Sequence, residues 1–389
     1  MNKNILFQNA VLYAEEEKVK NPLLIIRDGR ISEIVRNTEH LSTKEDIELL
    51  HFQKTVKVVP GFIDLHIHGA AGSDFMDGTE EAIRTIQENL PAEGTTSFLA
   101  ATMTQGKEKV LSALQQINLS SGTAAGGAEL LGVHLEGPFI SRKKAGAQPT
   151  QEIVLPSIEL FEEFQGAAGG KISIVTLAPE EEKGEELTNH LFKNGVIASI
   201  GHSNATGEEA LRSFGKGISH ATHLFNGMRG IHHRDIGAAG AVLLDPDVSA
   251  EIIADGVHID PYMLRLIYQV KKADKLILIT DAIRAKGMNK GIYELGGQEV
   301  YVGKEARLED GTLAGSILPM NEAIQNMIEF SGCSFEEAIQ MASLNPAKQA
   351  GADSYKGSIK EGKDADFTVL NDEFEVEATY VKGRKAFEK

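Results

Sequence analysis

Two histidines, His66 and His68, close an apolar run that begins at Val58, and this pair constrains the chain more than any other feature. Side chains two residues apart on a strand point to the same side of it, so both imidazoles face one way. Imidazole is the commonest protein ligand for transition metals such as zinc, iron and nickel. The run therefore predicts a strand that ends in half of a metal site, and the other half should follow other strands.

Four later apolar runs each end at a residue that binds metals. They are residues 131–135 before Glu136, 196–201 before His202, 218–222 before His223 and 276–280 before Asp281. Together with the two histidines, these residues form a candidate metal site drawn from several strand ends.

Three further runs, at 95–101, 172–177 and 250–254, carry no such ligand and bring the number of expected strands to eight. Stretches that can form helices separate most of these runs; examples are 80–93, 208–214 and 261–272. Alternating strands and helices predict an α/β protein with a parallel sheet. Eight repeats over roughly 300 residues predict a (β/α)8 TIM-like barrel, whose reactive groups lie at the C-terminal ends of its strands.

Both ends of the chain read as short β segments. Residues 27–30 give a hairpin turn signal between two of them, and neither end is long enough for a stable sheet of its own. We therefore expect residues 1–57 and 359–389 to build one small β-sandwich domain together. The catalytic barrel, residues 58–358, is then inserted between the two ends.

Composition favours a cytoplasmic enzyme. The chain has 389 residues and a net charge of −17, which argues against a nucleic-acid partner. No apolar stretch is long enough to span a bilayer, and the N-terminus lacks the features of a signal peptide. The single cysteine, Cys333, excludes an internal disulfide and suits a reducing compartment. An anionic substrate would need local cations to overcome the negative charge of the protein.

Seven motifs in order carry a family resemblance: PGFIDLHIHG, GVHLEGPFI, ASIGHSNAT, THLFNGM, IIADGVHI, LITDAI and GSIKEGKDADFTVL. They resemble the amidohydrolase superfamily and, more narrowly, the N-acetylglucosamine-6-phosphate deacetylase family. The resemblance covers nearly the whole chain, including both terminal β pieces. It implies a metal-dependent hydrolase of amino-sugar catabolism that converts N-acetylglucosamine 6-phosphate to glucosamine 6-phosphate and acetate. We also expect a homodimer.

The resemblance implies how the metals are held. Many amidohydrolases bridge two metals with a carboxylated lysine after the fourth strand, but residues 172–179 contain no lysine. We expect Glu136 to supply the bridging carboxylate instead. One metal would take His66, His68, Asp281 and a share of Glu136, and the other would take Glu136, His202 and His223. A divalent transition metal, zinc or iron, is expected, and the sequence leaves open whether one or both positions are filled.

The same groups suggest a mechanism. Metal-bound hydroxide would attack the acetamide, while Asp281 acts as general base and then protonates the leaving amine. Gln148 stands where the family has a histidine. It can donate a hydrogen bond to the substrate, but it cannot carry positive charge.

Further residues are implied as substrate contacts. The backbone at Asn226 and Gly227, together with the side chain of Arg234, resembles the family's phosphate-binding elements. His258 matches a histidine that contacts the sugar. A lid over the sugar is expected from the segment that holds Leu313 and Ala314.

The remaining candidates have ordinary explanations. We expect His134 to be a buried core or supporting residue and His220 to be structural. Turn chemistry accounts for Asp74 and Asp77. His40, His51 and His190 do not lie in any of the motifs that form the candidate site.

Two alternative functions stay open at this point. One is another amidohydrolase that acts on an N-acyl amino acid or a cyclic amide, although such substrates need no phosphate loop. The other is a non-catalytic amidohydrolase-like scaffold, although scaffolds usually lose metal ligands and this chain keeps all six.

Overall fold

The computed structural model describes residues 2–37, 47–123 and 126–389, so His40 lies outside the described residues. Within them, eight parallel strands curl into a barrel. In the order in which they pair, these are β6 (Phe62–Ile67), β9 (Thr95–Ala101), β11 (Glu129–Glu136), β12 (Ile172–Leu177), β13 (Ile197–Ile200), β14 (Ile218–Ala221), β15 (Ser249–Ile252) and β16 (Leu276–Leu278). All eight were predicted, and the (β/α)8 class is confirmed.

The barrel closes just beyond the last strand. Ile67 and Ala282 form a parallel bridge. On either side of it, the Asp281 N–H donates to the His66 carbonyl at 2.9 Å and the His68 N–H donates to the Ala282 carbonyl at 2.8 Å. This closure places three predicted metal ligands next to one another.

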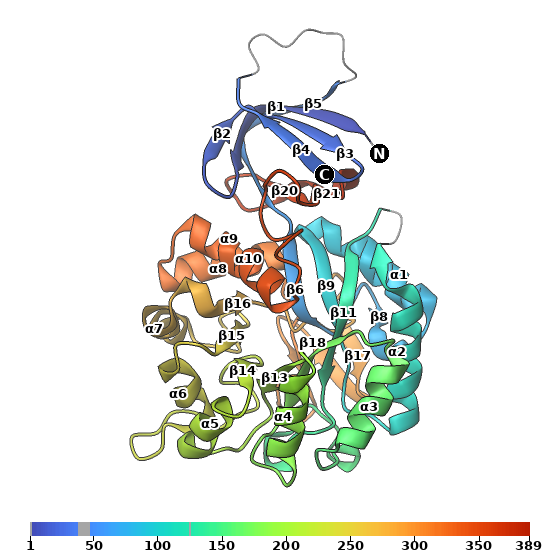
Figure 1. The fold of residues 1–389 in the computed structure, drawn as a ribbon, viewed down its shortest axis with the longest axis vertical. Helices are drawn as coiled ribbons and strands as arrows, with labels where there is room; N and C mark the ends of the chain where they lie inside the picture. Colours follow the sequence, from blue (N-terminus) through green and yellow to red (C-terminus); the bar gives the residue numbers. More distant parts are fainter. Residues whose placement is uncertain (1, 38–46, 124–125) are drawn as a thin grey trace.

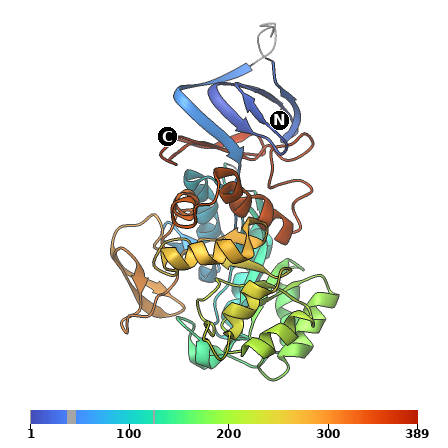
Figure 2. The same cartoon turned by 90° about the vertical axis from the view of Figure 1, so that its left-hand side faces the viewer.

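Helices surround the barrel (Figures 1 and 2). They are α1 (Glu80–Asn89), α2 (Lys107–Ser120), α3 (Ile158–Ala167), α4 (Gly184–Lys193), α5 (Gly207–Phe214), α6 (Gly237–Leu244), α7 (Pro261–Lys271), α8 (Met320–Ser331), α9 (Phe335–Ala342) and α10 (Leu344–Gln349). Short 3₁₀ turns lie at Phe75–Asp77, Leu90–Glu93, Arg142–Lys144, Thr150–Glu152 and Ala273–Lys275.

Local sequence explains where these helices start and which face they bury. Thr206 caps α5 by accepting from the Glu209 N–H, and the Glu209 carboxylate accepts from the Thr206 N–H in return, which is a capping box. In α1, Ile83 and Ile86 are fully buried because residues three apart share one helix face. None of the helices in the described residues has the length and apolar character that crossing a bilayer requires.

Both chain ends build a second sheet at one end of the barrel (Figure 1). Its strands are β1 (Lys3–Tyr13), β2 (Lys18–Lys20), β3 (Leu23–Arg27), β4 (Arg30–Val35), β5 (Ile47–Pro60), β20 (Phe367–Leu370), β21 (Val376–Val381) and β22 (Arg384–Glu388). N-terminal and C-terminal strands form two layers around a shared core in which the Phe7 and Phe367 rings lie 5.7 Å apart. The predicted sandwich is confirmed, whereas the division of the chain at 57/58 and 358/359 stays a prediction.

A buried ion cluster joins the sandwich to the barrel. The Lys356 side chain is 1% exposed, and its ammonium lies 2.8 Å from Glu129, 3.2 Å from Asp364 and 2.5 Å from Asp366. Burial acts to lower the pKa of Lys356, but the charges of Asp366 and Glu129 outweigh it and raise that pKa. Because Glu129 begins β11 and Asp366 immediately precedes β20, one ammonium ties the two parts together.

A third sheet was not predicted. It contains β17 (Gly291–Leu295), β18 (Gln298–Val302) and β19 (Ala306–Arg307), and it has a small apolar core that includes Leu295, Val300 and Ala314. Smaller strands are β7 (Gly69–Ala70), β8 (Ser73–Asp74) and β10 (Gly122–Thr123). The third sheet follows β16 in the chain and supplies part of the wall of the cavity described below.

Candidate metal centre

Glu136, His202 and His223 converge on one point at the barrel mouth. The two histidine Nε2 atoms are 3.2 Å apart, and they lie 3.1 Å and 2.9 Å from the same Glu136 oxygen. Nδ1 of His202 meets the Lys144 carbonyl at 2.8 Å, and Nδ1 of His223 meets the Asn226 carbonyl at 3.1 Å. Carbonyls only accept, so each ring carries a proton on Nδ1 and, when neutral, directs an Nε2 lone pair at the others. Three acceptors facing one another fit a shared cation.

A second group lies beside the first and contains His66, His68 and Asp281. Nε2 of His66 and of His68 lie 3.5 Å and 3.2 Å from the same Asp281 oxygen. The His66 Nε2 is buried and finds no hydrogen-bond partner among the described residues. Within each group the ligand atoms lie within 4.8 Å of one another, as metal ligands require. This set of imidazole and carboxylate donors fits a divalent transition metal.

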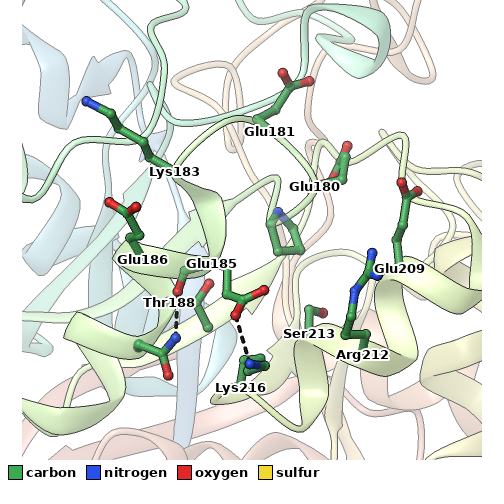
Figure 3. Close-up of a pocket in the computed structure, with 12 residues that line it drawn as sticks. Glu180, Glu181, Lys183, Glu185, Glu186, Thr188, Glu209, Arg212, Ser213 and Lys216 are labelled. Carbon is green, nitrogen blue, oxygen red and sulfur yellow. Dashed lines mark hydrogen bonds and ion pairs between the residues drawn. The ribbon is translucent and has the colours of Figure 1, made fainter.

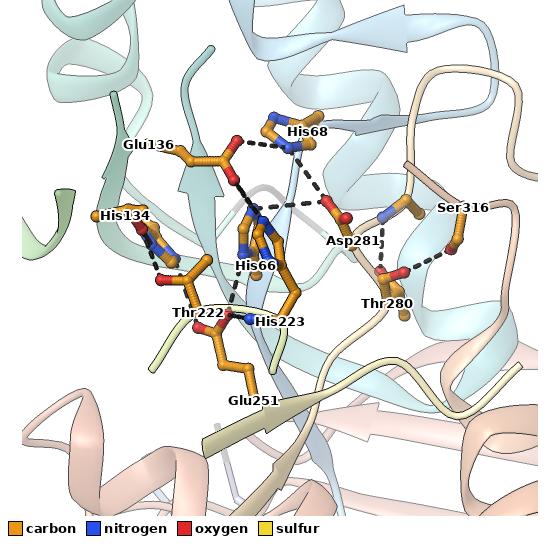
Figure 4. Close-up of polar contacts among 12 residues, drawn as sticks. His66, His68, His134, Glu136, Thr222, His223, Glu251, Thr280, Asp281 and Ser316 are labelled. Atoms are coloured by element: carbon orange, nitrogen blue, oxygen red, sulfur yellow. Dashed lines mark hydrogen bonds and ion pairs between the residues drawn. The ribbon is translucent and has the colours of Figure 1, made fainter. Parts of the chain in front are cut away.

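Glu136 reaches both groups (Figure 4). Its two oxygens lie 3.5 Å from His66 Nε2 and 3.4 Å from His68 Nε2, in addition to the contacts with the first group. Burial acts to raise the pKa of Glu136, but the histidines outweigh it and hold that pKa well below its usual range. The pKa of Asp281 is lowered too, because His66 and His68 outweigh its burial. Both carboxylates are therefore ionised and able to bind cations.

Three of these residues have strained backbones. His202, His223 and Asp281 have φ angles of 46°, 28° and 49°, in the left-handed region that side chains with a Cβ rarely adopt. Each directly or closely follows a barrel strand, so the sharp turn directs its side chain into the mouth. Such strain costs about 1–3 kcal/mol per residue and collects at functional sites.

One residue of this centre was missed. The run 250–254 was expected to carry no ligand, but Glu251 of β15 is fully buried and lies directly beneath both groups. Its carboxylate meets Nδ1 of His66 and Nε2 of His220, both at 3.0 Å. The signal in the sequence was a charged residue inside an otherwise apolar strand.

His134, expected to be a buried core or supporting residue, and His220, expected to be structural, are both fully buried. Nδ1 of His134 meets the Leu65 carbonyl at 3.0 Å, and its Nε2 meets the Thr176 hydroxyl at 2.7 Å. His220 is fully buried against Glu251. Asp74 and Asp77 cap a 3₁₀ turn reciprocally, which agrees with the turn chemistry expected of them.

A cavity of about 350 Å³ opens above the two groups. Among the predicted substrate contacts, those that line it are Gln148, Asn226, Gly227, His258 and Leu313. Ala314 does not line it, because that side chain is fully buried in the core of the third sheet. Arg234 does not line it either, since it lies on an exposed loop where its guanidinium donates to His233 at 2.7 Å. The cavity is instead lined by an arginine that was not predicted, Arg307 of β19.

Two of the lining residues are held by neighbours. The Gln148 amide donates to Glu136 at 2.6 Å, and its oxygen accepts from the Thr104 N–H at 2.8 Å. One amide hydrogen remains for a ligand. Nδ1 of His258 lies 2.6 Å from Asp255, which leaves Nε2 for a ligand. Burial acts to lower the pKa of His258, but Asp255 outweighs it and raises that pKa.

A larger cavity, of about 510 Å³, lies between α4 and α5 and shares no residue with the site (Figure 3). Charged side chains of both signs line it, and Lys216 pairs with Glu185 at 2.8 Å. Glu180 lines it as well and accepts from the Ser203 hydroxyl at 2.7 Å and the Asn204 N–H at 2.6 Å. Through Glu180, the lining of this cavity therefore supports the loop that follows His202.

Comparisons with known proteins agree with the geometry. Residues 57–386 match the model of the Amidohydrolase family. An N-acetylglucosamine-6-phosphate deacetylase from Bacillus subtilis (strain 168) is 44% identical over 393 aligned residues, which cover 100% of this chain and 98% of that protein. The structure of a Pasteurella multocida N-acetylglucosamine-6-phosphate deacetylase is similar with a TM-score of 0.90 and 32% identity, covering 99% of each chain.

A mutant N-acetyl-D-glucosamine-6-phosphate deacetylase from Mycobacterium smegmatis, solved in complex with N-acetyl-D-glucosamine-6-phosphate, also has a TM-score of 0.90, at 28% identity and 99% coverage of each chain. These likenesses span the barrel and the terminal sandwich alike. The chain belongs to the amidohydrolase family and, within it, to the N-acetylglucosamine-6-phosphate deacetylases.

Proposed function

We propose that this protein hydrolyses N-acetylglucosamine 6-phosphate to glucosamine 6-phosphate and acetate with the help of a divalent metal. The observation that carries the proposal is the pair of three-residue groups, joined by Glu136, on the floor of a cavity at the barrel mouth. The relatives reported above, which are named for this reaction, support it.

We assign the metal ligands as follows. Glu136, His202 and His223 hold one metal, and His66, His68 and Asp281 hold a second with a share of Glu136. Zinc or iron suits this mixture of imidazole and carboxylate ligands. When bound, such a metal lowers the pKa of water towards neutrality and polarises a carbonyl group.

Asp281 is the proposed proton carrier. Its contacts with His66 and His68 both use Oδ1, so Oδ2 is left to accept a proton from the attacking water. The same oxygen then passes the proton to the leaving amine, as general acid–base catalysis requires. Gln148 assists by donating its remaining amide hydrogen to the acetamide or the sugar.

The rest of the cavity holds the sugar phosphate. The Asn226 N–H already donates to the His223 carbonyl at 2.9 Å, so the N–H of Gly227 is the backbone donor left for the phosphate. His258 contacts the sugar through Nε2, and Leu313 covers the sugar. Arg307 adds positive charge to the wall. Arg234 lies outside the cavity of its own subunit, so the role implied for it requires a second copy of the chain. We therefore propose a homodimer. We also propose a cytoplasmic location.

Amide hydrolysis tests this function, measured as acetate release from the three N-acetyl compounds and as ring opening of the cyclic amide. Purified protein is given N-acetylglucosamine 6-phosphate, plain N-acetylglucosamine, an N-acetyl amino acid and a cyclic amide in parallel. The proposal expects efficient turnover of the phosphorylated sugar and much weaker turnover of the other three. Preference for the amino acid or the cyclic amide would point to another amidohydrolase activity. No turnover of any of them by fully metallated protein would favour a non-catalytic scaffold.

A further inference from the structure

Glu251 is a charged residue in the centre of the barrel that the proposed chemistry does not use. It lies on β15 with no exposed surface, beneath the two metal-binding groups (Figure 4). Burying a carboxylate is costly unless strong hydrogen bonds compensate for lost hydration. An apolar side chain would fill the same space without that cost. The charge therefore calls for a specific role.

All contacts of this carboxylate lead to histidines. One oxygen, Oε2, lies 3.0 Å from Nδ1 of His66 and accepts from the backbone N–H of His223 at 3.1 Å. The other, Oε1, lies 3.0 Å from Nε2 of His220. His66 belongs to one metal-binding group and His223 to the other. A single carboxylate thus contacts both halves of the centre.

The contact with His66 fixes where its ring proton lies. An ionised carboxylate can only accept, so the proton is on Nδ1 and the lone pair is on Nε2. That Nε2 atom faces Glu136 and Asp281, each at 3.5 Å. A hydrogen bond to the distal nitrogen of a ligating histidine sets its tautomer and increases its basicity. The opposite tautomer would put a proton where the metal must bind.

The contact with His223 acts on the backbone instead. His223 has a φ of 28° and lies two residues beyond the end of β14. Its N–H therefore has no partner in the sheet. Glu251 accepts from this N–H and so helps to hold the strained turn. The ring of His223 is oriented separately by the Asn226 carbonyl. The two groups consequently depend on Glu251 to different degrees.

We infer that Glu251 is a positioning residue that prepares both metal positions, and chiefly the position at His66, His68 and Asp281. The inference rests on the metal centre of the proposed function. Removing the acceptor should weaken binding at that position by about 10- to 100-fold, as for other residues that orient metal ligands. Binding at Glu136, His202 and His223 should change much less, because only a backbone contact is lost there.

A pair of substitutions separates this role from simple packing. Glu251→Gln keeps an oxygen that can accept from His66 and from the His223 N–H. Its amide group then turns towards Nε2 of His220, which can accept because Nδ1 of that ring finds no partner among the described residues and is free to carry the proton. Glu251→Leu fills similar space without any acceptor.

Metal affinity is measured on full-length protein by competition with a chromophoric chelator, with zinc as the probe and elemental analysis for stoichiometry. We expect Glu251→Gln to bind two zinc ions with affinities within about tenfold of the parent. We expect Glu251→Leu to retain one tightly bound zinc and to bind the other about 10- to 100-fold more weakly than the parent. A folded Glu251→Leu protein that binds both ions like the parent would overturn the inference. This measurement needs no substrate. If the zinc affinities follow this pattern but the parent protein does not deacetylate the sugar, the proposed function is refuted and the role of Glu251 is not.

A second measurement does not depend on the folding of any variant. The ¹⁵N shifts of the imidazole nitrogens in metal-free parent protein, recorded at a pH high enough to leave the rings neutral, report the tautomer of each histidine. We expect His66 to carry its proton on Nδ1. A proton predominantly on Nε2 of a neutral His66 would overturn the inference whatever the variants do.

Discussion

Substituting Gly227 by alanine tests whether the loop beside the cavity holds His202 in place. Gly227 has a φ of 58°, and a Cβ added there would lie 2.9 Å from Nδ1 and 3.0 Å from Cε1 of the His202 ring. The ring cannot move away freely, because that Nδ1 also donates to the Lys144 carbonyl at 2.8 Å. The added methyl must therefore strain the loop or tilt the ring.

The size of the effect follows from these two costs. A left-handed alanine costs about 1–2 kcal/mol, and a displaced imidazole rotamer costs about 0.5–1.5 kcal/mol. We expect Gly227→Ala to lower the free energy of unfolding of metal-free protein by about 2–3 kcal/mol in total. If the ring tilts, zinc affinity at Glu136, His202 and His223 should also fall by about 10- to 100-fold.

Gly230→Ala is the matched control. Gly230 lies in the same loop, has no atom within 4 Å of the added Cβ and does not have a positive φ. The free energy of unfolding of the Gly230→Ala protein should stay within about 0.5 kcal/mol of the parent value. Urea denaturation and chelator competition measure both quantities. If Gly227→Ala behaves like Gly230→Ala in both assays, the proposed coupling between loop and ligand is refuted.

Four further outcomes are expected. Asp281→Asn should lower kcat by roughly 10²- to 10⁴-fold, and near-normal turnover in a sample shown to be fully metallated would eliminate its role as proton carrier. Arg307→Ala should raise KM for the phosphorylated sugar by roughly tenfold, the low end for a charged hydrogen bond because Glu305 already pairs with Arg307 at 2.9 Å. Arg234→Ala should raise the same KM by about ten- to a hundredfold if a second copy brings it to the cavity. For either arginine, an equal loss of activity with the plain sugar would mean that the side chain supports only the fold. Lys356→Met leaves buried carboxylates without their cation and should lower the free energy of unfolding by about 3–5 kcal/mol; unchanged urea denaturation would contradict this.

The barrel was predictable because its strands are apolar runs and the expected ligands stand at their ends. Parallel strands bring their C-terminal ends to one rim, so His202, far from His66 in the chain, was expected near it. Glu251 was missed because ligands were sought after the strands and not inside them. Its supporting role depends on which strands face each other across the barrel, and periodicity does not encode that.

The loops explain the remaining differences. The third sheet was not predicted, although Gly296 and Gly297 between two alternating segments are a hairpin signal. Ala314 was expected in the lid but packs into the core of that sheet, and Arg307 of β19 lines the cavity instead. The direction of the long loop that carries Arg234 is set by tertiary contacts, which motifs alone do not specify.

The most direct test of the whole account is a metal titration of chelator-treated protein with N-acetylglucosamine 6-phosphate as substrate. Zinc or iron(II) is added stepwise while acetate release and bound metal are measured on the same samples. Metal-free protein should be inactive, and activity should return in proportion to metal bound at Glu136, His202 and His223. The His202→Ala protein should recover neither metal at that position nor activity. Undiminished acetate release by protein shown to contain no metal would contradict the account.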